Sequence, residues 1–279
     1  MKTLKTAFLL TALTLLLLFV GEAFGGRNGL ELGLAFAVLM NGTAYFFSDK
    51  IALMSSGAVP ISREQAPRLY EVMERLAGKA NLPMPKLYMI PQPAPNAFAT
   101  GRNPSHASVA VTQGLMELMD DEELEGVIAH ELSHVRNYDI LTSSIAATIA
   151  GAITFVARMG FWFGGGGNER DRGGALTALL MLIVAPIAAV LLQLGISRSR
   201  EYQADASGAK MVGHPYGLIR ALEKLGAANK RIPMDISPST SALCIVAPLN
   251  AGQFLRGLFS THPPLEDRIA RLQAMTITR

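Results

Sequence analysis

The chain is organised around the sequence Val127-Ile128-Ala129-His130-Glu131-Leu132-Ser133-His134-Val135. Its two histidines, His130 and His134, are four residues apart, so on an α-helix both imidazoles project from the same face. A helix is expected because Asp120 can act as its N-cap and Glu123 can complete a capping box. The acidic residues around Asp120 also suit the positive end of a helix dipole. The sequence therefore predicts a helix that presents a histidine pair, with Glu131 beside the first histidine.

Two imidazoles at this spacing can bind one zinc ion, and a neighbouring carboxylate can accept a proton from water. The pattern His-Glu-x-x-His on a helix is a signature of zinc metalloproteases. The alternative is a pair of ordinary histidines on a helix that binds no metal. A catalytic zinc ion generally has three protein ligands and one position open to water. Because Cys244 is the single cysteine, a thiolate zinc site and a disulfide framework are excluded.

A third ligand is available in the sequence Ser197-Arg198-Ser199-Arg200-Glu201-Tyr202-Gln203-Ala204-Asp205. Glu201 and Asp205 are four residues apart, so on a helix they face the same way. Glu201 can bind the metal, while Asp205 can accept a hydrogen bond from the free ring N–H of a ligand histidine. The alternative is an exposed acidic pair that is balanced by Arg198 and Arg200. Together with the histidine pair, the first interpretation predicts one Zn²⁺ ion per chain.

The composition indicates an integral membrane protein. Half of the residues are hydrophobic and 17% are charged, against about 25% charged in ordinary globular domains. Four apolar stretches predict four transmembrane helices, at about residues 6–20, 30–47, 140–157 and 175–196. Two alternatives are a cleavable signal peptide for the first stretch, and a buried hairpin in a soluble core for the last two.

These spans divide the chain into four parts. Residues 1–47 form an N-terminal transmembrane hairpin, residues 48–139 a protease part with the zinc helix, residues 140–196 a second hairpin, and residues 197–279 a protease part with the third ligand. The basic residues lie mostly in the parts outside the hairpins, while the opposite loops hold only Arg27, Arg170 and Arg172. This asymmetry predicts a multi-pass protein of the inner cell membrane, with both termini and the active site in the cytoplasm. The net charge of +3 comes without a polybasic stripe, so nucleic acid is not an expected partner.

The parts outside the membrane predict an α+β domain. Residues 62–80 have the pattern of an amphipathic helix that begins with a capping box at Ser62. Residues 86–90, 96–100 and 108–112 read as short strands. We expect them to form a small antiparallel sheet beside the zinc helix, in a zincin-like helical metalloprotease domain. On its own, Asn96 is typical of a turn residue after Pro95.

Several motifs occur together over essentially the whole chain. They are Asn96-Ala97-Phe98-Ala99, His130-Glu131-x-x-His134, Glu201-Tyr202-x-Ala204-Asp205, Thr261-His262-Pro263-Pro264 and Arg268. In this combination the sequence resembles the HtpX family of heat-shock membrane zinc endopeptidases, which is related to the CAAX prenyl proteases and other Glu-zincins.

The resemblance implies roles for the residues of these motifs. Glu201 is expected to be the third zinc ligand and Glu131 the general base. His262 and Arg268 are expected to face the reaction centre and to stabilise the oxyanion, although His262 by its residue type could also be a rival third ligand. The segment Asn96, Ala97 and Phe98 is expected to bind substrate along an edge strand.

The expected function is zinc-dependent hydrolysis of misfolded or damaged membrane proteins at the cytoplasmic face, as part of quality control under stress. The expected partners are membrane-protein substrates, the lipid bilayer and other membrane quality-control proteases. One alternative is a protease that processes prenylated proteins. Another is a non-catalytic scaffold or chaperone with a structural zinc site, which Glu131 disfavours because a structural site needs no base.

Overall fold

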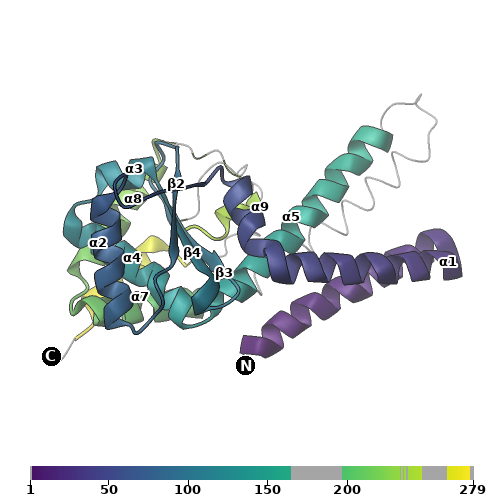
Figure 1. Cartoon of the computed structure of the whole chain (residues 1–279), viewed down its shortest axis with the longest axis horizontal. Coiled ribbons are helices and arrows are strands. Elements are labelled where there is room, and N and C mark those ends of the chain that lie inside the picture. The colour runs from purple at the N-terminus through teal and green to yellow at the C-terminus, as the bar shows by residue number, and fades with distance from the viewer. Residues whose placement is uncertain are drawn as a thin grey trace.

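The computed structural model describes residues 2–164, 197–232, 234, 236, 238–246 and 263–276. A globular part holds the sheet and most helices, and two helical elements, α1 (Lys2–Ser55) and α5 (Asp139–Gly164), project from one side of it (Figure 1). The predicted fourth span, residues 175–196, and His262 lie outside the described residues.

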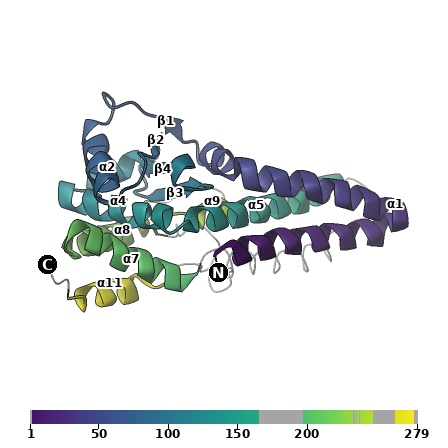
Figure 2. The ribbon, with the colours of Figure 1, turned by 60° about the horizontal axis from the view of Figure 1, so that its bottom comes forward.

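Helix α1 folds back on itself as a hairpin (Figure 2). The reversal occurs at Gly26, whose φ of 56° and ψ of −138° are open to glycine because it has no Cβ. The two arms pack closely, since a Cβ on Gly21 would collide with the carbonyl group of Gly29. Across the hairpin, Asn41 Nδ2 donates a hydrogen bond of 2.8 Å to Thr14 Oγ1. Both arms continue as helix almost to Gly26. The predicted spans, 6–20 and 30–47, left a longer connection between them.

The surface of α1 is rich in exposed apolar side chains, including Leu15, Phe19, Leu32 and Val38. Within the described residues, Gly25–Ser55 is the one helical segment that is long and apolar enough to cross a membrane. The segments Leu4–Phe19 and Asp139–Gly151 are shorter apolar helices. One apolar helix of sufficient length is thus present near the N-terminus, and the number of four spans stays a prediction.

Helix α5 packs against α1 near the globular part. Leu9 and Leu13 of α1 share a buried cluster with Ile145 and Ile149 of α5. Polar groups also meet in this contact, where the hydroxyls of Thr6 and Thr142 lie 3.1 Å apart.

The sheet has four strands in the order β1-β2-β4-β3. The bounds are β1 Val59–Pro60, β2 Lys86–Ile90, β3 Ala97–Gly101 and β4 Ala107–Thr112. Strands β3 and β4 form an antiparallel pair around the short helix η1 (Pro104–His106), but β2 and β4 are parallel. The prediction of an antiparallel sheet was therefore wrong, although its three strands lie within one residue of their predicted positions. The chain passes from β2 to β3 at the far edge of the sheet and returns as β4 between them, so β4 pairs with β2 as well as with β3 and runs in the direction of β2.

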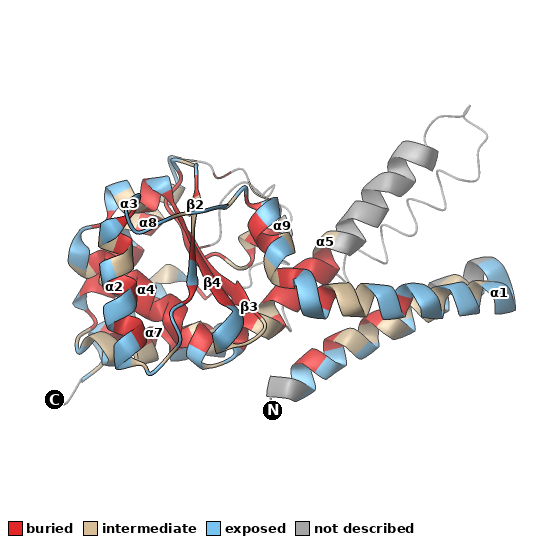
Figure 3. Ribbon diagram, in the orientation of Figure 1, coloured by how far each residue is buried: buried red, intermediate tan, exposed pale blue. Residues whose placement is uncertain are grey.

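The two faces of the sheet pack against different elements. Four residues of the sheet belong to the main core with α2 (Pro67–Lys79) and α4 (Asp121–Arg136): Ala97, Ala99, Val109 and Val111. Phe98 belongs to a second cluster with the end of α1. This alternation is expected because successive side chains of a strand point to opposite faces. Figure 3 shows that buried residues follow the sheet and α4.

Helix α4 (Asp121–Arg136) is the predicted zinc helix, and its N-terminus has the predicted capping box. The Glu123 N–H donates to Asp120 Oδ1 at 2.8 Å, and the Asp120 N–H donates to Glu123 Oε2 at 2.9 Å. Six apolar side chains of this helix are fully buried, among them Ala129 and Val135, and the other four are large residues of its core face. These four are Leu124, Val127, Ile128 and Leu132.

The bounds of the remaining helices are α2 Pro67–Lys79, α3 Gln113–Leu118, α7 Arg198–Val212, α8 Tyr216–Asn229, α9 Pro238–Ser241 and α11 Leu265–Gln273. Of these helices, α2, α7 and α8 pack against α4, while α9 packs against α5 and α11 against α7 and α8. The prediction that α2 begins at Ser62 was wrong, because Pro67 occupies its first position and Ala66 has the extended φ of −143° that a following proline favours. Ser62 instead donates its N–H to Gln65 Oε1 at 2.8 Å in a turn before the helix.

Candidate metal centre

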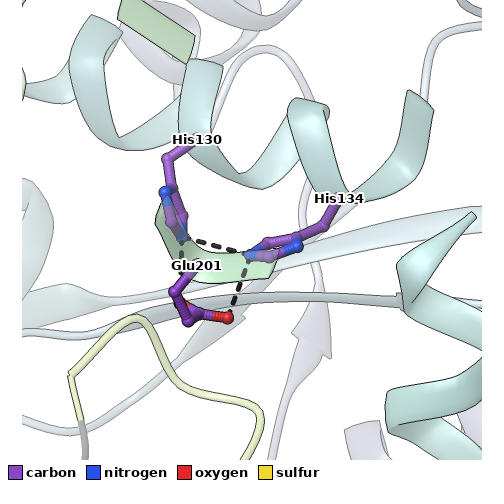
Figure 4. A group of neighbouring side chains, drawn as sticks. All are labelled: His130, His134 and Glu201. Atoms are coloured by element: carbon purple, nitrogen blue, oxygen red, sulfur yellow. Dashed lines mark hydrogen bonds and ion pairs between the residues drawn. The ribbon is translucent and has the colours of Figure 1, made fainter. Parts of the chain in front are cut away.

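Three side chains from two helices meet at the base of α5: His130 and His134 of α4 and Glu201 of α7 (Figure 4). The two Nε2 atoms lie 3.2 Å apart, and the Glu201 oxygens lie 3.7 Å from His130 Nε2 and 3.5 Å from His134 Nε2. Ligands that are 2.0–2.1 Å from a tetrahedral zinc ion lie about 3.3 Å from one another. The spacing of the three groups, and their two imidazoles and one carboxylate, therefore fit such an ion.

Helix α7 comes close to α4 because of Gly208. A Cβ at Gly208 would lie 3.0 Å from the backbone nitrogen of His130 and 3.1 Å from the carbonyl carbon of Ala129. Real Cβ atoms rarely come so close to backbone, so a side chain here would push the helices apart. Gly208 thus allows the glutamate of α7 to reach the two histidines of α4.

His130 is oriented by a buried chain of polar groups. Its Nδ1 lies 2.8 Å from Asp205 Oδ1, as the sequence predicted for one of the ligand histidines. Arg268 of α11 donates to both oxygens of Asp205, from Nε at 2.8 Å and from Nη2 at 2.7 Å. Burial alone would raise the pKa of Asp205, but the charge and hydrogen bonds of Arg268, together with the hydrogen bond and charge of His130, outweigh it and hold this pKa at about 2. A carboxylate at His130 Nδ1 keeps the proton there, which leaves the Nε2 lone pair for a metal.

His134 has a carboxylate partner as well, which was not predicted from the sequence. Its Nδ1 lies 3.5 Å from Asp139 Oδ2, and Asp139 Oδ1 lies 3.4 Å from Nη1 of Arg200. Asp139 is the first residue of α5, directly beyond the predicted zinc helix. Its spacing of five residues from His134 gave no helical pairing signal, because the contact depends on the turn between α4 and α5.

The electrostatics of the site favour a cation between the imidazoles. Burial lowers the pKa of His134, but the carboxylates of Glu201, Asp139 and Glu131 outweigh it and raise this pKa to about 9. Such surroundings stabilise positive charge at the point where the three groups converge. A divalent metal ion bound there would carry that positive charge.

Glu131 is fully enclosed beside this point. Burial raises its pKa from the usual range to about 7, and the backbone N–H of Ala99 hydrogen-bonds to its carboxylate and partly offsets this effect. Burial likewise lowers the pKa of His130. A buried carboxylate with a raised pKa beside a candidate metal position is a feature of functional sites.

A small cavity adjoins the three groups. Its walls include the candidate metal ligands His130, His134 and Glu201, and Glu131 beside them. The other walls come from Ala99 of β3, Ile140 and Ser143 of α5, and residues 242–245. The first turn of α5 thus forms part of the same cavity as the candidate catalytic groups.

The predicted substrate residues Asn96, Ala97 and Phe98 are not among the described residues that line this cavity. The Ala97 carbonyl accepts a hydrogen bond of 2.9 Å from the N–H of Ile245, and Asn96 Nδ2 donates to the carbonyl of Val246 at 2.8 Å. Phe98 is fully buried on the opposite face of the sheet. Ala99 is the residue of this strand that lines the cavity.

Arg268 is placed differently from its predicted role at the oxyanion. It is 0% exposed, and besides Asp205 its Nη1 donates to the carbonyl of Ile245 at 2.8 Å. Its Nη2 also lies 3.4 Å from His130 Nδ1, and Arg268 is not among the residues that line the cavity.

Comparison with known proteins places the chain in a family. The family model described as Peptidase family M48 matches residues 63–276. A protein named Protease HtpX homolog from Desulfatibacillum aliphaticivorans is 57% identical over 96% of this chain and 88% of its own length. Another of the same name, from Thermodesulfovibrio yellowstonii, is 53% identical over 99% of both chains.

A solved structure has a similar fold. The crystal structure of S. mikatae Ste24p matches with a TM-score of 0.54 and 20% sequence identity, over 97% of this chain and 64% of that one. The present chain thus spans somewhat less than two thirds of that protein. The fold, the arrangement of the histidines and glutamates, and the family match over most of the sequence lead to one conclusion. The chain belongs to peptidase family M48 and is a metalloendopeptidase.

Proposed function

We propose that this membrane metalloprotease hydrolyses peptide bonds with one zinc ion held by His130, His134 and Glu201. The observation that carries the proposal is the convergence of these three groups within 4.8 Å of one another, beside the buried carboxylate of Glu131. A bound zinc ion would lower the pKa of water toward about 7 and polarise the scissile carbonyl.

The residues of the chain perform the proton transfers in this proposal. Glu131 accepts a proton from the attacking water and returns it to the nitrogen of the leaving amine. The Ala99 N–H, which hydrogen-bonds to the Glu131 carboxylate, holds this base in place. A non-catalytic scaffold would have no need for a carboxylate enclosed at this position.

We assign the oxyanion role to His262 on its sequence motif alone, and a positioning role to Arg268. Three of the Arg268 contacts go to Asp205 and to the carbonyl of Ile245. A guanidinium with these donors already engaged stabilises the Asp205 carboxylate and, through it, the orientation of His130.

An extended substrate would pair with β3 beyond the Ala99 N–H, which already donates to Glu131. In this edge strand Ala97 already bonds to Ile245, while Ala99 lines the cavity. Pairing through backbone groups recognises an extended chain more than its side chains. This supports broad sequence specificity.

The position of the cavity supports substrates in or near the membrane. Ile140 and Ser143, in the first turns of the predicted third span, line the cavity next to His134. We infer a multi-pass protein whose active site faces the cytoplasm, in line with the distribution of its basic residues. Its proposed substrates are misfolded or damaged membrane proteins, and the proposed partners include other membrane quality-control proteases.

The experiment compares wild type with Glu131→Gln, each purified in detergent, on casein, on an unfolded membrane protein and on a prenylated peptide. Zinc content is quantified in both proteins. Activity lost in the variant with zinc retained near one equivalent supports the proposed mechanism. Equal cleavage by both proteins contradicts it, and preference for the prenylated peptide favours prenyl-protein processing instead.

A further inference from the structure

Each of the two proposed ligand histidines contacts a carboxylate, and each of these carboxylates contacts an arginine. In the first chain of contacts Asp205 links His130 to Arg268. In the second, Asp139 links His134 to Arg200, with one carboxylate oxygen directed to each partner. This second chain of contacts lies outside the sequence motifs described above.

Asp139 is well enclosed for a charged side chain. It is 3% exposed, and a buried carboxylate is costly unless it is paired and hydrogen-bonded. Its two partners within the described residues are His134 and Arg200, whose side chains are 16% and 13% exposed. The burial and the pairing together indicate that Asp139 has a specific role at this point.

The backbone before Asp139 has a conformation that brings it to His134. In a continuous helix, residues five apart point in directions that differ by about 140°, so they do not face each other. The helix is broken at Tyr138, whose φ of 58° is unusual for a bulky residue. The Tyr138 side chain is 51% exposed, so the packing of its ring does not account for this conformation. The turn at Tyr138 is what directs Asp139 back toward the metal site.

The contact also lies at a special point of the topology. Asp139 begins α5, and Arg200, which directly precedes Glu201, lies in the first turn of α7. The described residues on either side of the predicted second hairpin therefore meet in the Asp139–Arg200 pair. This pair joins the start of α5, just after the turn that follows α4, to α7, which carries Glu201.

We propose that Asp139 is a positioning residue of the metal centre, held in place by Arg200. It orients His134 through Nδ1 as Asp205 orients His130, and this role rests on the proposed zinc site. The contacts of Asp139, at 3.5 and 3.4 Å, are longer than those of Asp205, at 2.8 and 2.7 Å. Loss of Asp139 should therefore weaken metal binding less than loss of Asp205.

The test measures the zinc dissociation constant of the detergent-purified full chain by competition with a chromogenic chelator. Removing a carboxylate that orients a ligand histidine typically costs 10- to 100-fold in metal affinity. We expect about tenfold weaker binding in Asp139→Asn and about hundredfold weaker binding in Asp205→Asn. Peptidase activity of Asp139→Asn should recover at saturating zinc. Asp121→Asn, at an exposed residue of α4, is the matched control and should bind zinc like the wild type.

Arg200 provides the second arm of the test. Arg200→Gln leaves Asp139 in place and should weaken zinc binding about threefold. This effect is smaller than that of losing the carboxylate itself. Arg200→Lys keeps the charge and should restore most of the affinity. If Asp139→Asn shows no cooperative thermal unfolding, these two variants decide.

The proposal is overturned if Asp139→Asn binds zinc within twofold of the wild type. It is also overturned if Arg200→Gln and wild type bind equally, or if zinc does not restore the activity of Asp139→Asn. Failure of the proposed function gives a different result, because Glu131→Gln would then cleave substrate like the wild type whatever the zinc affinities are.

Discussion

Arg268 donates two hydrogen bonds to Asp205, from Nε to Oδ2 at 2.8 Å and from Nη2 to Oδ1 at 2.7 Å. The guanidinium is fully buried, and the same carboxylate lies 2.8 Å from His130 Nδ1. A bidentate pair of this kind fixes the carboxylate in both position and angle. Helix α11, near the C-terminus, is thereby connected to the histidine at the centre of α4.

Replacing Arg268 by Met is expected to destabilise the protein strongly. The change leaves Asp205 as a buried charge without its cation, and breaking a buried pair in this way typically costs about 3–5 kcal/mol. Denaturant unfolding in detergent measures the effect. Arg271→Met is the control on the same helix, since its exposed guanidinium lies 3.8 Å from the centre of the Tyr202 ring and should contribute about 1 kcal/mol or less. Equal losses in the two variants would contradict the role of the buried pair.

Gly208→Ala is expected to destabilise the protein and to weaken metal binding. In an ordinary helix interior, alanine is favoured over glycine by up to about 1 kcal/mol. Here the added Cβ would lie 3.0 Å from the His130 nitrogen, so α7 must move away from α4. Gly78→Ala in α2 is the matched control, because nothing lies within 4 Å of the position that its new methyl group would occupy. Opposite signs for the two changes in unfolding free energy are the expected result, and a stabilised Gly208→Ala would refute the close-packing argument.

Removal of the metal is expected to lower the melting temperature of the wild type. A ligand that binds only the folded state stabilises it by about 2.7 kcal/mol at a concentration 100-fold above its dissociation constant. Melting curves with and without a chelator measure this difference. Glu201→Gln, which lacks a ligand carboxylate, should show a much smaller difference. A chelator effect of the same size in this variant would exclude Glu201 as a ligand.

Asn96→Ala is expected to release the segment around Val246. The Asn96 side chain donates to the Val246 carbonyl at 2.8 Å and accepts from the Val246 N–H at 3.4 Å, and all of these groups are buried. Leaving such groups without partners costs about 1–3 kcal/mol. Hydrogen exchange at Ile245 and Val246 should become faster, while exchange in β2 remains unchanged. Unaltered protection of both residues would show that Asn96 does not hold this segment.

Local sequence patterns were sufficient for the elements that carry the metal centre. The capping box at Asp120, the histidine spacing and the pairing of Glu201 with Asp205 all follow from the geometry of single helices. The start of α2 at Pro67 also had a local signal, because a proline disfavours the helical conformation of the residue before it. The predicted helix was too long because the Ser62 and Gln65 pattern resembles a capping box but forms a turn before the helix.

The sequence by itself determined which residues are candidate metal ligands, the helix that presents two of them and the apolar character of the N-terminal hairpin. Each of these depends on residues within a few positions of one another. Only the tertiary structure decided that β4 lies between β2 and β3, that Phe98 points away from the cavity and that Ile245 bonds to the edge of β3. It also decided that Arg268 holds Asp205 and that Asp139 meets His134 and Arg200. These relationships depend on how helices and strands distant in the sequence pack, and on a backbone turn at Tyr138, which the local pattern of residues does not specify.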